Sequence, residues 1–327
     1  MNWLRRTLIS SSAMVLTAGG LVVGAGPAAA AHVSCGQTIV VNTVLDSHIG
    51  PCAKGLVVGA SGITLDLNGY TIIGNATPGE GPGVDITNRT GVTVKNGTIT
   101  QFDAGVAITG GSGNTVTGLS LVNNRGSGGS DFGDGVAVFA STANTIRFNR
   151  VQNNGPFSGV SLIQSSNNVI ENNQITGNNQ SAFNTSGIRV ENVGPNASNS
   201  NTIRNNLVQG SGLDGIQLFA RSSDNVVSNN QVLQNNREGI TAFAGSNRNV
   251  IQDNVVRFNG RGPIPGNGIF IRGAAGTLPA PANNIIRRNV STNNTLFDLR
   301  DGTPNCGTNV WSANQAITGT PACVFGP

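Results

Sequence analysis

The sequence predicts an all-β protein: a single-domain parallel β-helix, which is a solenoid of about 24-residue coils with disulfide-closed caps. Three observations carry this prediction. Asparagine recurs every five residues in frames that return along most of the chain. Short segments of alternating apolar and polar residues lie between these asparagines, as in half-buried strands. Two pairs of cysteines lie at opposite ends of the chain.

The composition of the 327 residues excludes several other classes of protein. Hydrophobic residues make up 37% and charged residues 10%, whereas disordered chains combine low hydrophobicity with high net charge. Glycine, with 46 residues, and asparagine are poor helix formers, which argues against a helical fold. Without Arg5 and Arg6 the 19 basic residues become 17, against 15 acidic ones, and they form no cluster. Nucleic acid is therefore not an expected partner.

The first 31 residues are typical of a signal peptide. The arginine pair at 5–6 supplies the positive segment, residues 8–25 the apolar segment, and residues 28–31 the small side chains for cleavage before Ala31 or His32. An uncleaved membrane anchor is the alternative, although Ser and Gly interrupt the apolar stretch. No other stretch approaches the roughly 20 apolar residues of a membrane span. We therefore expect a secreted, extracellular protein with no membrane span after signal cleavage.

Four cysteines remain in the predicted mature chain. Cys35 and Cys52 are 17 residues apart near one end, and Cys306 and Cys323 are 17 apart near the other. In an exported protein this pattern predicts two local disulfides that close the caps. Zinc is the alternative, but zinc-binding cysteines usually lie two to four residues apart. Each disulfide would close a loop of about 18 residues, worth roughly 3 kcal/mol in the chain-entropy model.

The repeat frame consists of polar positions five residues apart, with an aliphatic residue two positions after each of the first two in nearly every copy. Its copies begin at Asn144, Asn168, Asn201, Asn225, Asn249 and Asn284. Their spacings of 24, 33, 24, 24 and 35 residues indicate a period of 24 with insertions in two coils. A third unit, Gly followed by Val or Ile and then by an apolar residue two positions on, lies between the copies. It occurs at 135–138, 159–162, 187–190, 215–218, 239–242 and 268–271.

Each period therefore holds three short strands, whose alternation directs one set of side chains inward and the other outward. No two-residue hairpin turn recurs between them, so we expect coils that stack in parallel about 4.8 Å apart. The second asparagine of each frame is expected at a tight corner in left-handed geometry, with its side chain in an asparagine ladder. The inward aliphatic residues are expected to form columns, for example Ile146, Ile170, Ile203, Val227, Ile251 and Ile286.

The frame resembles the parallel β-helix repeat of the pectate-lyase-like superfold. The segment 62–74, Gly-Ile-Thr-Leu-Asp-Leu-Asn-Gly-Tyr-Thr-Ile-Ile-Gly, is similar to the first coils of many secreted bacterial members, including proteins related to the copper-site maturation factor of nitrous oxide reductase. The resemblance covers roughly residues 60–300 and implies a right-handed parallel β-helix. It is specific for fold but not for function, because this superfold carries lyases, hydrolases, epimerases and non-enzymes. The expected organisation is a signal peptide at 1–31, an N-terminal cap at 32–60, the β-helix at 61–297 and a C-terminal cap at 298–327.

The resemblance implies that a ligand cleft follows the sheet of the third strand. The loops beside that strand are also the variable ones in this sequence, and variable loops on a rigid frame often carry function. These loops are 124–133, 193–200, 260–266 and 273–282. The outward positions of the sheet include Ala107, Ala137, Ser161, Arg189, Gln217 and Thr241, and, two residues further on, Phe139, Ile163, Glu191, Phe219, Phe243 and Arg272.

Asp103, Asp131 and Asp134 form the candidate metal site. Neighbouring coils would draw these carboxylates together, and calcium prefers several carboxylate and carbonyl oxygens. The alternative is that they are ordinary turn residues. Calcium is the one cofactor for which the sequence offers ligands, and its presence stays open.

Arg189, Asp214 and Glu238 are the candidate catalytic residues. Asp214 and Glu238 hold equivalent places in successive coils, and two close carboxylates could bind a cation or act as acid and base in glycoside cleavage. Arg189 lies in mid-sheet with Glu191 on the same face. In the pectate lyases that the chain resembles, an arginine abstracts the proton next to a uronate carboxylate, helped by calcium. The alternatives are solvated turn carboxylates and a surface ion pair of little energetic value.

Phe139, Phe219 and Phe243 form a candidate stacking platform for sugar rings, or else they pack under a neighbouring loop. Gln217 and Arg272 are further candidates for ligand binding. The only histidines, His32 and His48, precede the repeats, so a histidine-dependent triad on the β-helix is excluded. Three family motifs are also absent: the Gly-His-Gly of polygalacturonases, the Asp-Pro-His-Asp of mannuronan epimerases and the Arg-x-Pro-x-x-Arg of pectate lyases.

Three functions remain open at this point. The first is a β-helix that binds a carbohydrate or another cell-envelope ligand along its exposed sheet without changing it. The second is a glycan-active enzyme, either a calcium-assisted polyuronide lyase or a glycoside hydrolase. The third is a structural or envelope-assembly protein, including one that aids metal-site maturation, although the shortage of His, Met and free Cys argues against copper handling. We expect a monomer whose partner is an extracellular or cell-envelope polysaccharide.

Overall fold

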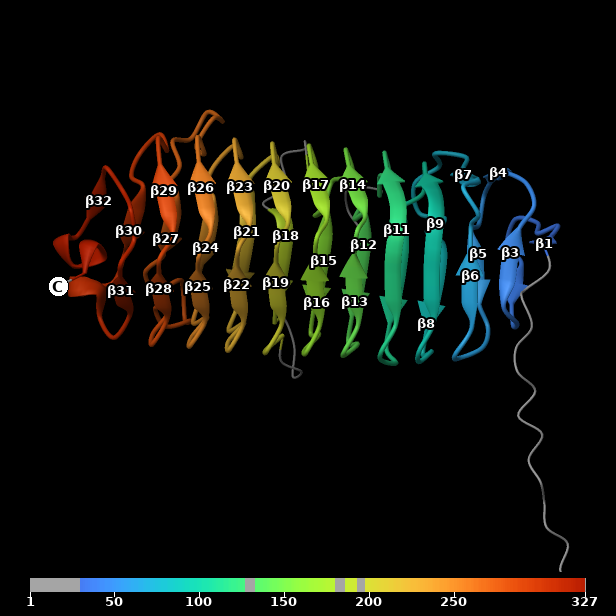
Figure 1. The fold of residues 1–327 in the computed structure, drawn as a ribbon, viewed down its shortest axis with the longest axis horizontal. Coiled ribbons are helices and arrows are strands. Elements are labelled where there is room, and N and C mark those ends of the chain that lie inside the picture. Colours follow the sequence, from blue (N-terminus) through green and yellow to red (C-terminus); the bar gives the residue numbers. More distant parts are fainter. Residues whose placement is uncertain (1–29, 127–132, 180–185, 193–197, 327) are drawn as a thin grey trace, which may run out of the picture.

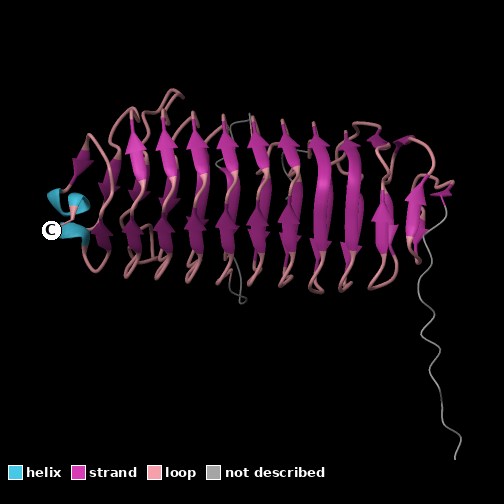
Figure 2. Cartoon of the chain, viewed as in Figure 1, coloured by secondary structure: helices cyan, strands magenta, loops and turns pink. Residues whose placement is uncertain are grey.

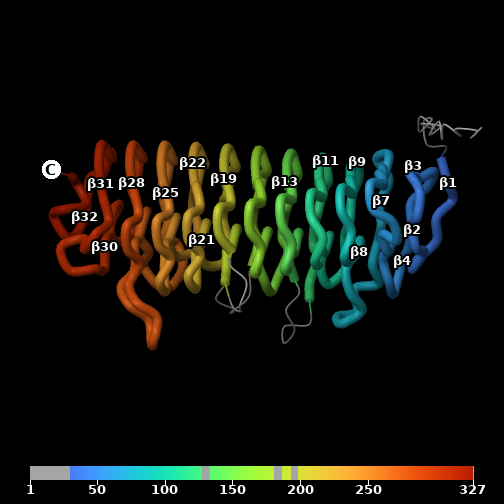
Figure 3. The backbone as a smooth tube through the Cα atoms, turned by 90° about the horizontal axis from the view of Figure 1, so that it is seen from below, coloured from blue at the N-terminus to red at the C-terminus, as the bar shows by residue number. Residues whose placement is uncertain are grey.

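The computed structural model describes residues 30–126, 133–179, 186–192 and 198–326, and these fold as the predicted right-handed parallel β-helix (Figure 1). Strands of successive coils pair in parallel, in register, along a single axis. Figure 2 shows strands along the whole axis and helix only at the C-terminal end, where η1 (Pro304–Cys306) and η2 (Ala322–Phe325) lie. In Figure 3 the coils appear as separate turns that follow one another from the N-terminal to the C-terminal end.

The strands stand in three rows. Row 1 contains β1 (Ala30–Ala31), β3 (Thr43–Leu45), β6 (Thr64–Asp66), β13 (Thr145–Arg147), β16 (Val169–Glu171), β19 (Thr202–Arg204), β22 (Val226–Ser228), β25 (Val250–Gln252), β28 (Ile285–Arg287) and β31 (Val310–Ser312). Row 2 contains β4 (Ile49–Cys52), β7 (Thr71–Gly74), β14 (Arg150–Gln152), β17 (Gln174–Thr176), β20 (Leu207–Gln209), β23 (Gln231–Leu233), β26 (Val255–Arg257) and β29 (Val290–Thr292). The longer strands β9 (Thr93–Thr100) and β11 (Thr115–Val122) belong to both rows.

Row 3 forms a separate sheet and corresponds to the third unit of the repeat. It contains β2 (Thr38–Ile39), β5 (Leu56–Val58), β8 (Pro82–Thr87), β10 (Ala104–Thr109), β12 (Val136–Phe139), β15 (Val160–Ile163), β18 (Ser186–Glu191), β21 (Asp214–Phe219), β24 (Ile240–Ala242), β27 (Ile269–Ile271), β30 (Leu299–Asp301) and β32 (Gly319–Thr320).

The inward aliphatic residues form the predicted columns. Ile146, Ile170 and Ile203 are register partners in successive coils and are fully buried. The column continues through Val227, Ile251 and Ile286 and ends on Trp311 of β31. Full burial of one such side chain contributes roughly 1.5–3 kcal/mol, so the columns hold the coils together along the axis.

Buried asparagines form three ladders at the edges of the rows. In each rung the side-chain Nδ2 and the backbone N–H of one asparagine both donate to Oδ1 of the next, as between Asn206 and Asn230 at 3.0 Å for both contacts. The ladder of the second frame position runs from Asn149 through Asn173, Asn206, Asn230, Asn254 and Asn289 to Asn314. The ladder prediction is confirmed, and the first and third frame positions form ladders as well.

The left-handed corner lies one residue earlier than predicted. Positive φ angles occur at Asn172, Asn205 and Asn229, each directly before a ladder asparagine, and also at Phe148 and Arg288 in equivalent places. The ladder asparagines of that position do not have them. The reason is that the left-handed residue turns the chain, and this turn lets the next side chain point along the axis toward the following coil.

Both disulfides form as predicted, with Cα–Cα distances of 5.3 Å for Cys35–Cys52 and 6.2 Å for Cys306–Cys323. The two cap segments also contribute strands to the stack, since β3 pairs with β6 and β30 with β27. The exact boundaries of the caps stay predictions. Residues 1–29 lie outside the described residues, so the signal peptide stays a prediction too. The described part of the chain begins with β1, which pairs with β3.

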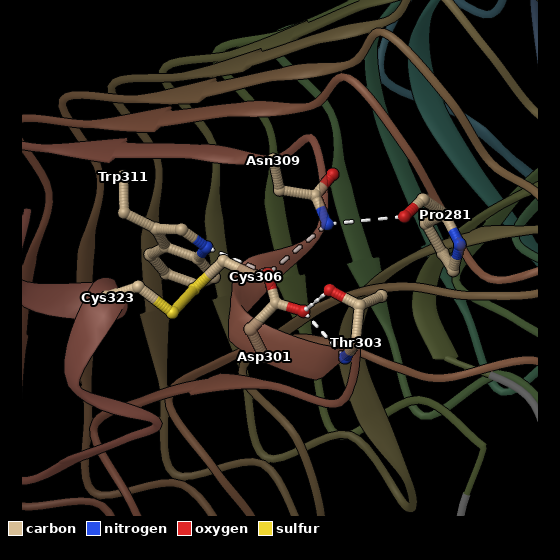
Figure 4. Close-up of a disulfide and its surroundings, with 7 residues drawn as sticks. All are labelled: Pro281, Asp301, Thr303, Cys306, Asn309, Trp311 and Cys323. Carbon is tan, nitrogen blue, oxygen red and sulfur yellow. Dashed lines mark hydrogen bonds between the residues drawn. A yellow bond between two sulfur atoms is a disulfide. The ribbon is translucent and has the colours of Figure 1, made fainter.

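A buried carboxylate organises the C-terminal end (Figure 4). Asp301 accepts hydrogen bonds from the indole Nε1 of Trp311 at 2.9 Å and from the amide of Asn309 at 3.2 Å. Its other oxygen accepts from the backbone N–H and the hydroxyl of Thr303 at 2.9 and 2.6 Å. These bonds hold Trp311 at the end of its inward column, close to the Cys306–Cys323 disulfide. No helix within the described ranges has the length and apolar character that crossing a membrane requires.

Candidate functional site

A groove with a volume of about 510 Å³ lies on the outer face of row 3, over β10, β12, β15 and β18. Volumes of this size are usual for ligand pockets. Its lining consists of Ala107, Thr109, Ala137, Val138, Phe139, Phe157, Ser161, Ile163, Arg189 and Glu191. The groove is therefore on row 3, the sheet on which the family resemblance predicts a cleft.

The floor of the groove is made of small outward side chains in one register column. Ala107 pairs with Ala137, and Ala137 with Ser161. Phe139, whose exposed fraction is 43%, and the half-buried Phe157 supply two aromatic faces. The hydroxyl of Ser161 is buried and has no hydrogen-bond partner among the described residues. It is a polar atom in an otherwise apolar floor.

One wall of the groove is an ion pair. Arg189 Nε lies 2.6 Å from Glu191 Oε2, and both side chains are about nine-tenths buried, with exposed fractions of 11% and 10%. Arg189 Nη1 also donates to Gln217 Oε1 at 2.9 Å, and its guanidinium lies 4.8 Å from the ring centroid of Phe219. Arg189 and Glu191 lie on the same face of the strand, as expected, and these contacts hold the guanidinium in one place.

Beyond this wall, arginine and phenylalanine side chains cover row 3 in an interleaved stack that we call the Arg–Phe stack. It consists of Arg189, Phe219, Phe243, Arg272, Phe270, Arg300 and Phe297, with neighbouring groups 4.7 to 5.9 Å apart. Phe219 and Phe243 are tilted against each other at 5.4 Å rather than exposed as a platform. Open space over the sheet is therefore found where this stack ends, at Arg189.

Asp214 is fully buried at the start of β21 and is held by a bidentate arginine. Arg237 Nε and Nη2 donate to its two oxygens at 2.8 and 2.9 Å, and Gln217 Nε2 donates at 2.9 Å. Burial opposes the charge on Arg237, but the hydrogen bond and charge of Asp214 and the charge of Glu238 raise the pKa of the guanidinium above its ordinary value. Asp214 is thus a paired carboxylate beneath the surface.

Glu238 lies next to Asp214, as predicted: its backbone N–H donates to Asp214 Oδ1 at 3.2 Å. Its own carboxylate accepts from Arg272 Nη2 at 2.8 Å and from the backbone and side chain of Asn267 at 2.5 and 2.9 Å. Burial, followed by the negative charge of Asp214, raises the pKa of Glu238, while Asn267 and Arg272 oppose this rise. Neither carboxylate lines the groove.

The predicted metal site is described only in part, because Asp131 lies outside the described residues. Asp103 accepts hydrogen bonds from two backbone N–H groups. That of Gly79 lies 2.9 Å from Oδ1 and 3.0 Å from Oδ2, and that of Gly81 lies 2.7 Å from Oδ2. Asp134 is buried and accepts the N–H of Ser158 at 2.9 Å. The described residues contain no group of three or more His, Cys, Asp or Glu side chains placed to hold a metal ion. The calcium site stays a prediction.

The groove unites some of the predicted site residues and leaves out others. Phe139 and Arg189 line it, whereas Gln217, Phe219, Phe243, Arg272, Asp214 and Glu238 belong to the stack and the buried pairs beside it. Sequence reasoning missed Phe157, which comes from the turn before β15. An aromatic residue directly before the Ser-Gly that opens a third strand was the available signal.

Several solved structures share the fold. The A-module of the mannuronan C-5 epimerase AlgE4 of Azotobacter vinelandii is 15% identical, with a TM-score of 0.58 over 86% of this chain and 85% of the module. The periplasmic alginate epimerase AlgG is 15% identical, with a TM-score of 0.55 over 86% of this chain and 62% of that one. The Dettilon tailspike protein is 19% identical, with a TM-score of 0.56 over 86% of this chain and 53% of that one. At such identities the likeness shows the fold alone. No curated protein matches the sequence.

A family of proteins matches the sequence directly. The family described as periplasmic copper-binding protein (NosD) matches residues 60–261, which is more than half of the chain. The matched range runs from β6 to β26 and includes every residue that lines the groove. The chain belongs to the NosD family.

Proposed function

We propose that this protein binds a carbohydrate in the groove over β10, β12, β15 and β18. The observation that carries the proposal is the form of this groove, which has a flat floor of small side chains flanked by Phe139 and Phe157. Sugar rings present apolar C–H faces that stack on aromatic side chains, and their hydroxyls seek polar groups. Ser161 and the Arg189–Glu191 pair supply such groups at the floor and at one wall.

The structural neighbours support a carbohydrate. AlgE4 and AlgG are named as epimerases of mannuronan and alginate, which are polysaccharides. In a parallel β-helix a long linear ligand can lie across several coils, because the outward columns repeat at the strand spacing. The groove crosses four strands of row 3, which suits an extended segment of such a chain.

The protein functions outside the cytoplasm, since it carries two disulfides and belongs to a periplasmic family. Export to the cell exterior is the finer proposal, and it rests on the predicted signal peptide. A polysaccharide of the envelope or of the surroundings would then be the available ligand.

Binding without turnover accounts better for the candidate catalytic residues than a lyase or hydrolase does. The oxygens of Asp214 and Glu238 are occupied by Arg237, Gln217, Arg272 and Asn267. A general acid or base must reach the substrate within hydrogen-bonding distance, and neither carboxylate lines the groove. Arg189 does line it, but its guanidinium is engaged by Glu191, Gln217 and the ring of Phe219.

The residues of this chain do not fit the copper that the family description names. Copper sites use thiolate, thioether and imidazole ligands. All four cysteines are in disulfides, and the sequence has two methionines and two histidines. His48 Nδ1 accepts the backbone N–H of Thr71 at 3.0 Å, so this ring nitrogen is already engaged by the backbone. His32 is exposed beside Asp46. Copper therefore has no part in the proposed function.

A binding screen with a matched pair of variants tests the proposal. The purified protein is titrated calorimetrically with neutral and uronate-containing polysaccharides, with and without calcium, and the same mixtures are assayed for new reducing or unsaturated ends. We expect binding to at least one polysaccharide without turnover. Phe139→Ala should weaken polysaccharide binding about tenfold, a typical loss for an aromatic side chain that the ligand covers. Phe148→Ala should not, because Phe148 is exposed to 58% at a corner between rows 1 and 2, outside the groove. Failure to bind any polysaccharide overturns the proposal, and turnover restores the enzyme alternative.

A further inference from the structure

The charges around the groove indicate which class of sugar it takes. Among the described residues that line it, two are charged, Arg189 and Glu191, and these neutralise each other at 2.6 Å. This described part of the lining therefore has no net charge. The cation that could meet an acidic sugar is already engaged by a carboxylate on the same strand.

Carboxylates stand at both ends of the groove floor. In the outward column of row 3, Asp85 of β8 is the register partner of Ala107, one strand beyond the groove. Its carboxylate accepts the hydroxyl of Thr87 at 2.6 Å and has no arginine or lysine partner among the described residues. Glu191 stands at the opposite end. A polyuronate lying across these strands would bring its own carboxylates toward both.

Arg125 lies at the side of the groove, but it adds no positive charge to the lining. The backbone N–H of Arg125 donates to the carbonyl of Phe102, directly before Asp103, and the residue bridges Gly155, two positions before Phe157. Asp103 and Asp134 lie at the same side, since the N–H of Gly105, two residues after Asp103, donates to the carbonyl of Asp134 at 3.1 Å. Two carboxylates therefore accompany one arginine on this side, and Arg125 is not among the residues that line the groove.

From these charges we infer that the groove selects uncharged sugar rings and rejects polyuronates. The inference rests on the proposed function and names its substrate class. Specificity between two similar ligands arises from unpaired or repelling charges as well as from attractive contacts. Here the rings of a neutral glycan would stack on Phe139 and Phe157, with a hydroxyl hydrogen-bonded to Ser161 Oγ. A uronate ring of the same shape would place its carboxylate beside Glu191 or Asp85, where the described residues offer no unengaged cation in the lining.

Matched oligosaccharides test this inference. Mannose and mannuronate oligomers of equal length and linkage differ only in whether each ring carries a hydroxymethyl or a carboxylate group, and glucose–glucuronate and galactose–galacturonate pairs extend the comparison. We expect the neutral member of one pair to bind at least about tenfold more tightly than its uronate partner, with a gap that narrows at high salt. If a uronate oligomer binds as tightly as its neutral partner or more tightly, the inference is wrong although the proposed function stands. If no pair binds, the proposed function itself fails.

Two charge variants separate electrostatic selection from shape. Glu191→Gln removes the carboxylate that engages Arg189, and this variant should bind uronate oligomers about tenfold more tightly than the original protein. Asp85→Asn removes the carboxylate at the other end without touching that ion pair and should act in the same direction, so it keeps the test valid if Glu191→Gln does not fold. Circular dichroism checks the fold of both. Unchanged uronate affinity in two folded variants would contradict the inference.

Discussion

Arg189 and Glu191 stand two residues apart on β18, and Arg189 Nε lies 2.6 Å from Glu191 Oε2. The same guanidinium donates to Gln217 and lies over the ring of Phe219. One side chain therefore ends the open groove and begins the Arg–Phe stack. The wall of the candidate site is part of the packing of the neighbouring coil rather than a separate addition to the surface.

Arg189→Met tests how much this pair contributes to stability. The change keeps most of the side-chain length but leaves the Glu191 carboxylate, exposed to 10%, without its cation. We expect the free energy of unfolding in urea to fall by about 2 kcal/mol, somewhat less than for a fully buried pair. Arg204→Met is the control, since Arg204 is exposed to 49% in its pair with Glu171, and its loss should be much smaller. Equal losses in the two variants would contradict the structural role of the Arg189 pair.

Asn206→Ala tests the asparagine ladder. The side chain of Asn206 donates to Asn230 and to the carbonyl of Ile170, and it accepts from Asn173. Because its removal leaves buried polar groups unpaired in both neighbouring coils, we expect a loss of about 3 kcal/mol in the free energy of unfolding. Gln174→Ala, at an exposed position of β17, should leave the unfolding midpoint nearly unchanged. A ladder variant that unfolds at the midpoint of the control would show that neighbouring coils compensate.

The fold could be predicted because the same residue types recur at fixed positions of the repeat, and few folds fit such a pattern. Ile170 and Ile203 recur at the same place in the frame, and the structure stacks them as partners. Asn173 and Asn206 likewise recur and form a rung of the ladder. Which residue takes the left-handed corner could not be predicted in the same way, since residues as different as Phe148 and Arg288 occupy it.

The site was harder to predict because it depends on side-chain partners rather than on the period. Asp214 was correctly placed near Glu238, but its principal partner is Arg237, which lies in a turn with no fixed place in the repeat. Phe219 occupies an outward position like Phe139. Arg189 lies over the ring of Phe219, however, whereas the ring of Phe139 lines the open groove. A pattern of outward positions shows which side chains leave the core and not which of them fill the space above the sheet.

Asp301→Ala tests the C-terminal end of the helix. The buried carboxylate accepts from Trp311, Asn309 and Thr303, and its removal leaves these donors without a partner. We expect a loss of about 3 kcal/mol in the free energy of unfolding and a red shift of tryptophan fluorescence as water reaches Trp311. Asp224→Ala, in an exposed pair with Arg248, should change neither quantity appreciably. Unchanged fluorescence in the Asp301 variant would show that the disulfide alone holds the end closed.

Copper titration tests the mismatch between this chain and its family description. Because the cysteines are oxidised and His48 is engaged by Thr71, we expect the folded protein to lose added copper to a chelator of moderate affinity. Retention of one equivalent by the protein with both disulfides intact would show that side chains other than Cys, Met and His bind the metal. Reduction of the disulfides provides the contrast, since free thiolates are strong copper ligands and should then retain the metal.

Glu238 should make stability depend on pH in a defined direction. Burial and the charge of Asp214 raise the pKa of Glu238 above the ordinary glutamate value of 4.5. A carboxyl group whose pKa is raised by folding contributes its full stability below the unfolded pKa, and this contribution is lost as the pH rises through the folded pKa. Glu238→Gln has no such proton, so the stability of this variant relative to the original protein should increase as the pH rises above that ordinary value. Urea unfolding of both proteins at a series of pH values measures the difference. A difference that stays constant or shrinks with rising pH would mean that Arg272 and Asn267 outweigh the desolvation of the carboxylate.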